Sequence, residues 1–257
     1  MDEDVTENGL ELEATPEDPA PPGPTDEELL AVAEAPGLWL PGGPHAFAFQ
    51  GEGFAFVASG RLAWVHSLRL TGESVEQTID RVEAMLGLKG LEEASWWLSA
   101  LSTPEGLADR LLGAGFTPDD PPALTALVID EPPAGEPSVE VRRAESFEDV
   151  LRALEIDWEA FGAPEEERQR RRAEAEASWP QLQANDRHAT YLAYGDEGEP
   201  IGFGRAVFTP EGGLLLGGAT LPEARGKGVY TALVHARWND AVERHVPRLI
   251  VAAGPLS

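Results

Sequence analysis

The sequence predicts an α+β fold made of two tandem copies of one unit, each a mixed, mostly antiparallel sheet flanked by helices. Apolar runs of strand length, separated by short turns, occur in both halves, at 46–70 and 189–221. Stretches with apolar residues at helical spacing flank these runs. Both halves follow the order of helix, antiparallel strands, helix and strand, which is typical of a tandem duplication. The first half continues with a further helix and strand that the second half lacks.

Composition divides the 257 residues into an acidic tail and two globular halves. Residues 1–25 are acidic and rich in proline, and no lysine or arginine precedes Arg61, so we expect a disordered tail. The net charge of −27 disfavours nucleic acid and anionic membranes as partners. The absence of cysteine excludes disulfides and thiolate zinc sites. No apolar run reaches the roughly 20 residues that span a bilayer, and no secretory signal opens the chain, so we expect a cytoplasmic location.

The first half, residues 26–130, predicts a small domain of alternating helices and strands. Thr25, with Glu28 three residues later, is typical of a capping box that starts a helix ending near Ala35. A meander of three strands follows, and then a helix, a strand, a second helix and a last strand. The expected ranges are 46–49, 53–58, 62–70, 74–86, 94–99, 103–112 and 124–129. Thr103 is the expected N-cap of the helix at 103–112.

Residues 131–137 hold three prolines and one glycine and form the expected linker to the second half, residues 138–257. After a first strand, Ser146 with Asp149 three residues on predicts another capped helix, which carries an apolar stripe to Phe161. A charged helix, a meander of three strands, a helix and a final strand complete this half. Their expected ranges are 165–179, 189–194, 200–208, 213–221, 229–242 and 248–253.

The segment from Leu214 to Val234 organises the second half, because it joins an apolar strand, a glycine-spaced turn and a helix. Glycines in Arg225-Gly-Lys-Gly228 let the backbone approach an anion, and the first N–H groups of the helix point toward it. The helix dipole and two basic side chains add positive potential. The segment therefore predicts a phosphate-binding site. It is no P-loop, and Thr231 stands where a dinucleotide fingerprint needs its third glycine.

The stretch from Pro222 to Tyr230 is similar to the acetyl-CoA-binding motif of the GNAT family of N-acetyltransferases, Arg/Gln-x-x-Gly-x-Gly/Ala. Arg225, Gly228 and Tyr230 stand at its three fixed positions. Tyr230 departs from the pattern, since the family usually has a small residue there. This departure means that the tyrosine either narrows the pyrophosphate pocket or points away along the helix.

The resemblance covers residues 139–253 and, more faintly, residues 46–130. It implies two tandem GNAT-like domains, of which the first is a degenerate copy. Thr71-Gly-Glu-Ser-Val75 stands where the second copy has its glycine loop and carries an acid where phosphate would lie. We therefore expect only the second copy to bind acetyl-CoA.

The resemblance also implies a site for acetyl-CoA as co-substrate. Main-chain N–H groups at 226–229 would hold the pyrophosphate, and the backbone at 219–221 would line the pantetheine arm. The splay between this strand and the strand at 249–252 would admit the thioester. In the family an amine attacks directly with help from a base, and backbone N–H groups stabilise the oxyanion. The implied cofactor-binding residues are Ala219, Thr220, Leu221, Arg225, Gly226, Lys227, Gly228, Val229 and Tyr230.

The general base is unassigned. Tyr191, Glu211 and His235 are candidates, although each is more simply explained as a packing or surface residue. The five histidines are scattered, so no metal site is expected. The basic run from Arg168 to Arg172 lies between glutamates and predicts a solvated helix face.

Two functions remain open at this point. The first is transfer of an acetyl group from acetyl-CoA to an amine of a small molecule or peptide. The alternative is a catalytically silent acyl-CoA-binding or protein-interaction module, because only 29 residues follow Gly228, where the family adds another helix and two strands. A sheet edge left open after Ala253 would also favour a homodimer.

Overall fold

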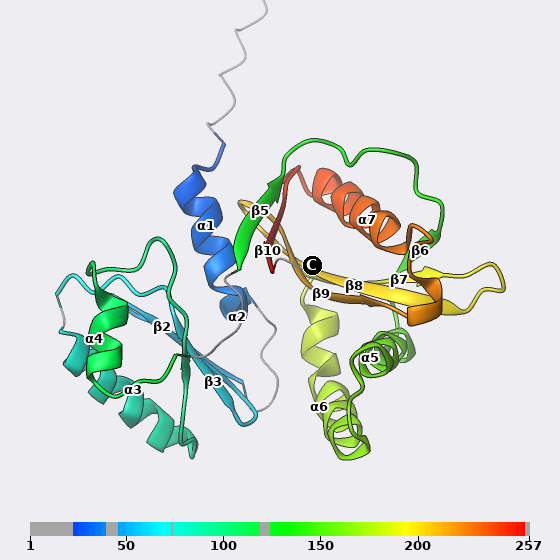
Figure 1. Cartoon of the computed structure of the whole chain (residues 1–257). Coiled ribbons are helices and arrows are strands. Elements are labelled where there is room, and N and C mark those ends of the chain that lie inside the picture. Colours follow the sequence, from blue (N-terminus) through cyan, green and yellow to red (C-terminus); the bar gives the residue numbers. More distant parts are fainter. Residues whose placement is uncertain (1–22, 40–45, 73, 119–123, 255–257) are drawn as a thin grey trace, which may run out of the picture.

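The computed structural model describes residues 23–39, 46–72, 74–118 and 124–254. Two sheets flanked by helices lie side by side (Figure 1), which confirms the predicted α+β fold with two tandem units. The smaller sheet has the strand order β1-β2-β3-β4, and the larger has the order β5-β10-β9-β8-β7-β6. Within these ranges, no helix is both long and apolar enough to cross a membrane. The predicted acidic tail lies almost entirely outside the described residues.

The first half contributes four helices and five strands to the described structure. They are α1 (Asp26–Glu34), α2 (Pro36–Trp39), β1 (Phe47–Gln50), β2 (Ala55–Ser59), β3 (Leu62–His66), α3 (Val75–Lys89), β4 (Ser95–Trp96), α4 (Leu107–Gly113) and β5 (Thr125–Ile129). The second half contributes β6 (Glu140–Arg143), α5 (Phe147–Phe161), α6 (Glu165–Ala184), β7 (His188–Tyr194), β8 (Pro200–Thr209), β9 (Gly212–Thr220), the short 3-10 turn η1 (Pro222–Ala224), α7 (Val229–Glu243) and β10 (Leu249–Ala253).

The two halves repeat one topology, as the sequence predicted. In the first, β1, β2 and β3 form an antiparallel meander, α3 follows, and β4 pairs parallel to β3. In the second, β7, β8 and β9 form the meander, α7 follows, and β10 pairs parallel to β9. The equivalent of the loop before α7 in the first half is therefore the loop before α3.

Capping residues in the sequence correctly predicted the starts of two helices. Thr25 and Glu28 form the predicted capping box of α1, and Ser146 and Asp149 form that of α5. Each box satisfies N–H groups that the first helical turn leaves unpaired. The expected N-cap at Thr103 was wrong, since α4 begins after Gly106. Thr103 instead donates its N–H to the carbonyl of Leu68 at 2.9 Å, which holds it in extended backbone beside the first sheet.

Some element lengths also differ from the predicted ones. The strand expected at 94–99 is only the two residues of β4, and β3 ends at His66. Ser67 has a positive φ of 55°, which turns the chain out of the strand at that point. The charged helix α6 continues through Pro180 to Ala184. None of the residues of α6 is fully buried, so this long helix has no apolar face packed in a core and is largely covered by charged side chains.

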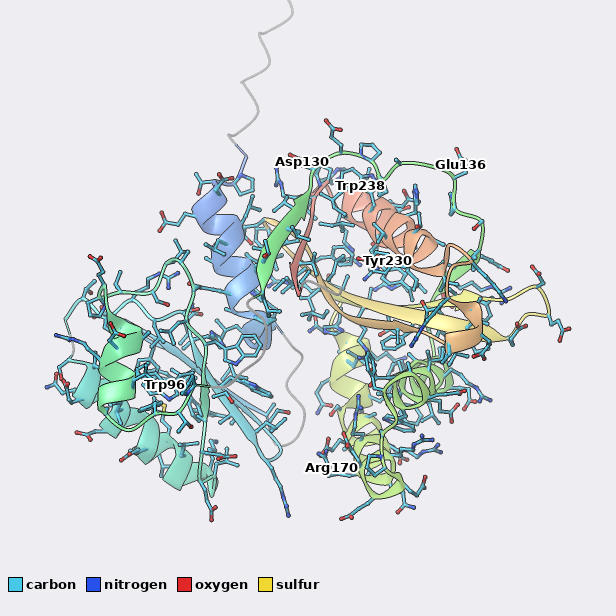
Figure 2. All side chains as sticks on the ribbon, in the orientation of Figure 1. Trp96, Asp130, Glu136, Arg170, Tyr230 and Trp238 are labelled. Atoms are coloured by element: carbon cyan, nitrogen blue, oxygen red, sulfur yellow. The ribbon has the colours of Figure 1, made fainter. Side chains whose placement is uncertain are left out.

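Helices cover both faces of the larger sheet. On one face, α7 packs its buried side chains, among them Leu233 and Trp238, against the sheet (Figure 2). On the other face, α5 packs against Leu192 and Phe203 through Ala153 and Ile156. Trp238 is labelled in Figure 2 on the α7 helix, close above the strands. Because helices cover both faces, a ligand can reach the strands of the larger sheet only at the ends of those strands.

Two elements of the first half belong to the larger sheet, which corrects the boundary expected at residues 26–130. Strand β5 pairs antiparallel with β10 over five residues. Helix α1 packs Leu29 and Val32 against Leu214 and Ile250 of the larger sheet, on the face opposite α7. The first half thus supplies a strand that the second half lacked in the sequence. The expected open edge after Ala253 was wrong, because β5 occupies it, and the homodimer through that edge loses its basis.

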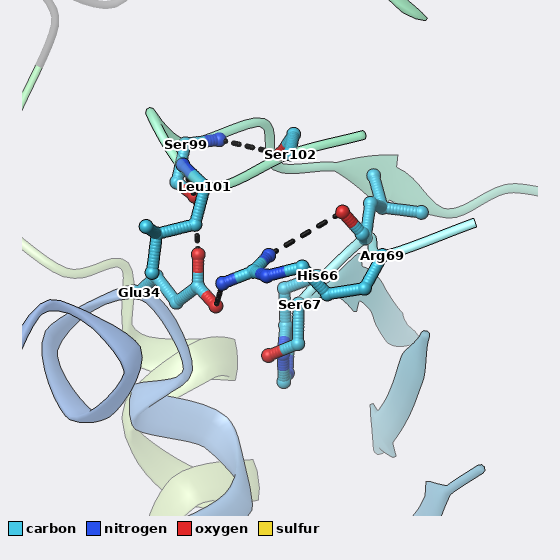
Figure 3. A network of polar contacts seen from close by, with 8 residues as sticks. Glu34, His66, Ser67, Arg69, Ser99, Leu101 and Ser102 are labelled. Atoms are coloured by element: carbon cyan, nitrogen blue, oxygen red, sulfur yellow. Dashed lines mark hydrogen bonds and ion pairs between the residues drawn. The ribbon is translucent and has the colours of Figure 1, made fainter. Parts of the chain in front are cut away.

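The end of α1 also ties the two sheets together (Figure 3). The buried carboxylate of Glu34 accepts a hydrogen bond from Arg69 Nη2 at 2.6 Å and another from the Ser99 hydroxyl. Arg69 follows β3, and Ser99 follows β4, so both partners belong to the smaller sheet. Because α1 packs on the larger sheet, this contact fixes one half against the other.

Two buried histidines make the stability of the fold depend on pH. Burial lowers the pKa of His188 to about 4, and the positive charge of Arg205 acts in the same direction. Burial also lowers the pKa of His66 to about 4, against the opposing charge of Glu34. Neither His188 ring nitrogen has a hydrogen-bond partner among the described residues. Both rings are therefore neutral in the folded protein at neutral pH.

We expect the free energy of unfolding to fall as the pH decreases from 6.5 toward 4. In the unfolded chain these histidines titrate near their ordinary pKa of 6.5, so the unfolded state binds more protons in that window. Urea denaturation at pH 7 and pH 4.5 measures the loss. The loss should shrink by about 2 kcal/mol in His188→Gln. The variant His245→Asn, at an exposed histidine, should leave the loss unchanged, and equal losses in all three proteins would contradict the assignment.

Candidate functional site

The loop between β9 and α7 combines a 3-10 turn with two glycines in the left-handed region. Gly226 has a φ of 76° and Gly228 a φ of 81°, conformations that other residues rarely adopt. Gly228 is the residue directly before the first helical turn of α7. A Cβ added to Gly228 would lie 2.6 Å from Ser138 Oγ, so both conformation and space require glycine here.

The start of α7 presents its N–H groups without a side-chain cap. Gly228 carries no side chain, and none of the described residues caps this helix. Helix α3, the equivalent in the first half, begins differently, because Ser74 Oγ accepts from the N–H of Gln77 at 3.1 Å. Gln77 in turn accepts from the N–H of Ser74 at 2.9 Å. The first copy therefore satisfies with its own side chains the donors that the second leaves available for an anion.

Two unneutralised positive charges stand in this loop. Arg225 and Lys227 are exposed, and the described part of the chain offers neither an ion-pair partner. The N–H of Lys227 donates to the Ala224 carbonyl at 3.4 Å, while its own carbonyl accepts from Ser138 Oγ at 3.3 Å. In a chain of net charge −27, two free cations beside a free helix start favour binding of an anionic group.

The two residues that open α7 point in different directions. Val229 is 2% exposed and packs into the core between α7 and the sheet. Tyr230 is 64% exposed, and Figure 2 labels it at the start of α7. The Tyr230 side chain is therefore largely in solvent, unlike that of Val229. This exposure favours the alternative in which the tyrosine points away along the helix.

Beyond the first two residue pairs, β9 and β10 separate. They pair only at Leu249 with Gly213 and at Ile250 with Leu214, although both strands continue. In the second half of β9, Gly217 and Gly218 are exposed in spite of their central place in the sheet. Exposed backbone in a central strand means that no neighbouring strand covers it there. The splay that the sequence predicted is therefore present in the backbone.

A β-bulge lies at this splay. Gly204 pairs with Gly218 and Arg205 pairs with Leu216, so Gly217 is an extra residue on β9. Its φ of 61° lies in the left-handed region. Bulges bend a strand and release its backbone groups from the ladder, and they occur often beside active sites. Sequence analysis missed this feature, although the pair Gly217-Gly218 inside an apolar strand is the signal for it.

The three residues after the bulge lead into the loop. Ala219 and Thr220 are half-buried at the end of β9, and Leu221 donates its N–H to the Ile201 carbonyl at 3.0 Å. The side chains of Ala219 and Leu221 pack against the cluster of Phe203, on the α5 face. The segment 219–229 thus runs without interruption from the splay to the start of α7.

Tyr191 lies in the core on the α7 side. It is 4% exposed, and its hydroxyl donates to the Asp240 carboxylate, which also binds Arg244 at 2.7 Å. Burial raises the pKa of the Tyr191 hydroxyl, and the Asp240 carboxylate raises it further. A hydroxyl held in this way stays protonated and is engaged. This geometry gives Tyr191 a packing role.

Replacing Tyr191 with phenylalanine should therefore affect stability and not turnover. The loss of a buried hydrogen bond to a carboxylate costs about 1.5–3 kcal/mol. Asp240 keeps Arg244 as a partner, so the variant should still fold. Urea denaturation measures the first effect, and steady-state acetylation kinetics measure the second. A large fall in kcat with unchanged stability would give Tyr191 a catalytic role instead.

The other two candidate bases come from different elements, the turn before β9 and helix α7. Glu211 is in the turn that precedes β9, and six residues at about 3.4 Å each put it roughly 20 Å from Gly217. Its Oε2 is buried and has no hydrogen-bond partner among the described residues. His235 lies six residues along α7 from Val229, about 9 Å at a rise of 1.5 Å per residue. The structure does not bring Tyr191, Glu211 and His235 together.

The described ranges contain no group of three or more histidine, aspartate or glutamate side chains arranged to hold a metal ion. The basic run in α6 pairs with acids: Arg170 with Glu174 at 2.9 Å and Arg171 with Asp157 at 2.5 Å. Arg170 lies on the side of α6 that faces the smaller sheet in Figure 2, and a Cβ added to Gly60 would lie 3.8 Å from its Nη1. The run also makes two ion pairs from α6 to α5, because Arg172 pairs with Glu155 at 3.4 Å.

Comparison with known proteins finds a family model that matches part of the chain. Residues 150–255 match the sequence model of the acetyltransferase (GNAT) family. No curated protein resembles the chain closely enough in sequence to count as a match. A GCN5-related N-acetyltransferase from Kribbella flavida has a similar structure, with a TM-score of 0.57, 16% identity, and coverage of 81% of this chain and 79% of that one.

Two other solved structures resemble the whole chain. A tandem GNAT protein from the clavulanic acid biosynthesis pathway has a TM-score of 0.53 and 16% identity, over 84% of this chain and 77% of that one. A conserved protein of unknown function from Staphylococcus epidermidis has a TM-score of 0.56 and 14% identity, over 82% of this chain and 84% of that one. At these identities the likeness shows a shared tandem fold.

Proposed function

We propose that the chain transfers an acetyl group from acetyl-CoA to an amine, because residues 150–255 match the model of the acetyltransferase (GNAT) family. The observation that carries the proposal is the uncapped start of α7 behind two left-handed glycines. The acyl donor binds there through its pyrophosphate. The free N–H groups and the dipole of α7 attract the anion, and Arg225 and Lys227 add charge.

The path of the donor follows β9 toward the bulge. From the start of α7, the chain leads back through Leu221 and Ala219 to the exposed backbone at Gly217 and Gly218. A pantetheine arm along this edge brings the thioester to the splay between β9 and β10. An amine held there attacks the thioester carbon, the C–S bond breaks, and the amine proton passes to a base. Positioning both reactants in one place supplies much of the rate.

The alternative function is a catalytically silent acyl-CoA-binding module. A specific observation favours it: the Tyr191 hydroxyl is engaged in the core, and Glu211 lies in the turn before β9, roughly 20 Å along the strand from the bulge. A base is still available without them, since the splay is open to solvent at Gly217 and water can carry the proton. The two functions share one donor site and differ only in turnover.

Titration with acetyl-CoA, followed by calorimetry, tests the donor site. We expect saturable binding, and Arg225→Glu should weaken it at least tenfold, because it reverses a charge beside the pyrophosphate. Arg187→Glu provides a matched control, since this exposed arginine directly precedes β7 and lies outside the loop between β9 and α7. No binding at millimolar acetyl-CoA would overturn the proposal. Binding without acetylation of any amine in a broad panel would favour the silent module.

A further inference from the structure

Arg205 is a charged residue in the middle of the larger sheet that the donor site does not use. It lies on β8 opposite Leu216, at the register shift that creates the bulge. A Cβ added to Gly217 would lie 3.7 Å from Arg205 Nη1, so the guanidinium lies directly against the bulge. Its carbon Cζ is 4.7 Å from the centre of the Phe203 ring. This stacking fixes the plane of the guanidinium beside the splay.

The charge of Arg205 has no partner of its own. Among the described residues, no carboxylate or carbonyl accepts a hydrogen bond from it, and none forms an ion pair with it. The nearest acid that influences it, Asp157, is already paired with Arg171 at 2.5 Å. Burial lowers the pKa of Arg205, and the charge of Arg171 lowers it further. Asp157 and Glu167, at 2.5 Å and 4.0 Å, thus both pair with Arg171, and neither pairs with the partly buried guanidinium of Arg205.

Such a charge is costly unless something binds it. A partly desolvated cation without a partner destabilises the fold, whereas a guanidinium offers a planar fork of donors that matches a carboxylate. The fork stands beside the place where the thioester would lie. The pyrophosphate site cannot use it, because that site is at the start of α7, and Arg205 is on the sheet face covered by α5.

We propose that Arg205 binds a carboxylate of the acceptor, so that the acceptor is an amine that carries a carboxylate a few atoms away, such as an amino acid or a short peptide. The proposal rests on the proposed function, whose acceptor it names by class. A single guanidinium matches a singly charged carboxylate better than a dianionic phosphate group. The carboxylate anchors the acceptor at Arg205 and leaves its amine free to reach the splay.

The experiment compares amines that differ only in this group. L-amino acids, their carboxamides and aminoalkylphosphonates are used as acceptors with saturating acetyl-CoA. For the wild type we expect kcat/KM at least tenfold higher for the acids than for the carboxamides. Arg205→Gln should remove this preference through a higher KM for the acids, while Arg205→Lys should keep part of it. Arg187→Gln replaces an exposed arginine directly before β7 and serves as control. This variant should keep the full preference for the acids.

A binding measurement tests the carboxylate site at Arg205 even if the protein acetylates none of these amines. Titration of the same acids and carboxamides into the protein with CoA present should show binding of the acids that Arg205→Gln weakens at least tenfold. Unchanged acetyl-CoA affinity and an unchanged thermal midpoint in Arg205→Gln separate this effect from damage to the donor site or fold. An equal preference in Arg205→Gln, a preference for phosphonates, or no binding of the acids would each overturn the inference. If the wild-type protein did not bind acetyl-CoA at all, that result would overturn the proposed function instead.

Discussion

Gly228→Asp should lower the affinity for acetyl-CoA at least a hundredfold. A carboxylate directly before the first turn of α7 accepts hydrogen bonds from the N–H groups that would otherwise bind the pyrophosphate. The same carboxylate repels the phosphate charge. The new side chain also meets Ser138 Oγ, since a Cβ at this position would lie 2.6 Å from it, and the backbone keeps a φ of 81° only under strain.

The matched control for this variant is Gly162→Asp. Gly162 ends α5 with a φ of 74°, and a Cβ there would meet nothing within 4 Å. Both substitutions add the same charge and a similar backbone strain, but only Gly228→Asp also meets Ser138 Oγ, so urea denaturation should first show that both variants are folded under the titration conditions. Calorimetric titration with acetyl-CoA should then detect weaker binding in Gly228→Asp alone. Equal affinities in the two variants would remove the start of α7 from the donor site.

The parts of the site that depend on local chemistry could be predicted from the sequence. A glycine-spaced turn before a helix was predicted at Arg225 to Gly228, and the structure has that turn, with Gly226 and Gly228 in the left-handed region. The capping boxes of α1 and α5 were predicted from Thr25 and Ser146, and both are present. Such features are set by a few neighbouring residues, so a short window of sequence contains the necessary information.

The parts that depend on distant contacts could not be predicted in this way. Nothing in the residues of β5 says whether it pairs with β4 or with β10, since the apolar pattern of an edge strand suits either sheet. In the same way, the apolar face of α1 fits any exposed sheet face of similar width. The unpaired charge of Arg205 was equally hidden, because its environment comes from α5, α6 and the bulge in β9.

The contribution of the first half explains how the splay can be stable. Strand β10 is bound to β9 over only two residues but to β5 over five. Without β5, the far end of β10 would lack a neighbour on either side. Helix α1 then packs across Leu214 and Ile250, the point where β9 and β10 still meet. The first half, which has lost the glycine loop, thus acts as the support that holds the donor site open.

This support leads to the prediction that Val32→Asp strongly destabilises the larger sheet, although Val32 lies outside residues 150–255. Val32 is 4% exposed and packs in the cluster that contains Leu214 and Ile250. A carboxylate there has no cation to pair with in that apolar cluster, and an uncompensated buried charge costs about 3–5 kcal/mol. Urea denaturation should detect a loss of this size.

The control is the neighbouring residue on the same helix. Ala31 is exposed, so Ala31→Asp adds the same charge to α1 without burying it and should change the unfolding free energy by less than about 0.5 kcal/mol. If the two halves were independent, Val32→Asp would leave intact a separate unfolding transition of the larger sheet. If α1 and the larger sheet form one core, Val32→Asp should lower the urea concentration at which half of the larger sheet is unfolded. Acetyl-CoA binding should then be lost at the same urea concentration as the folded structure.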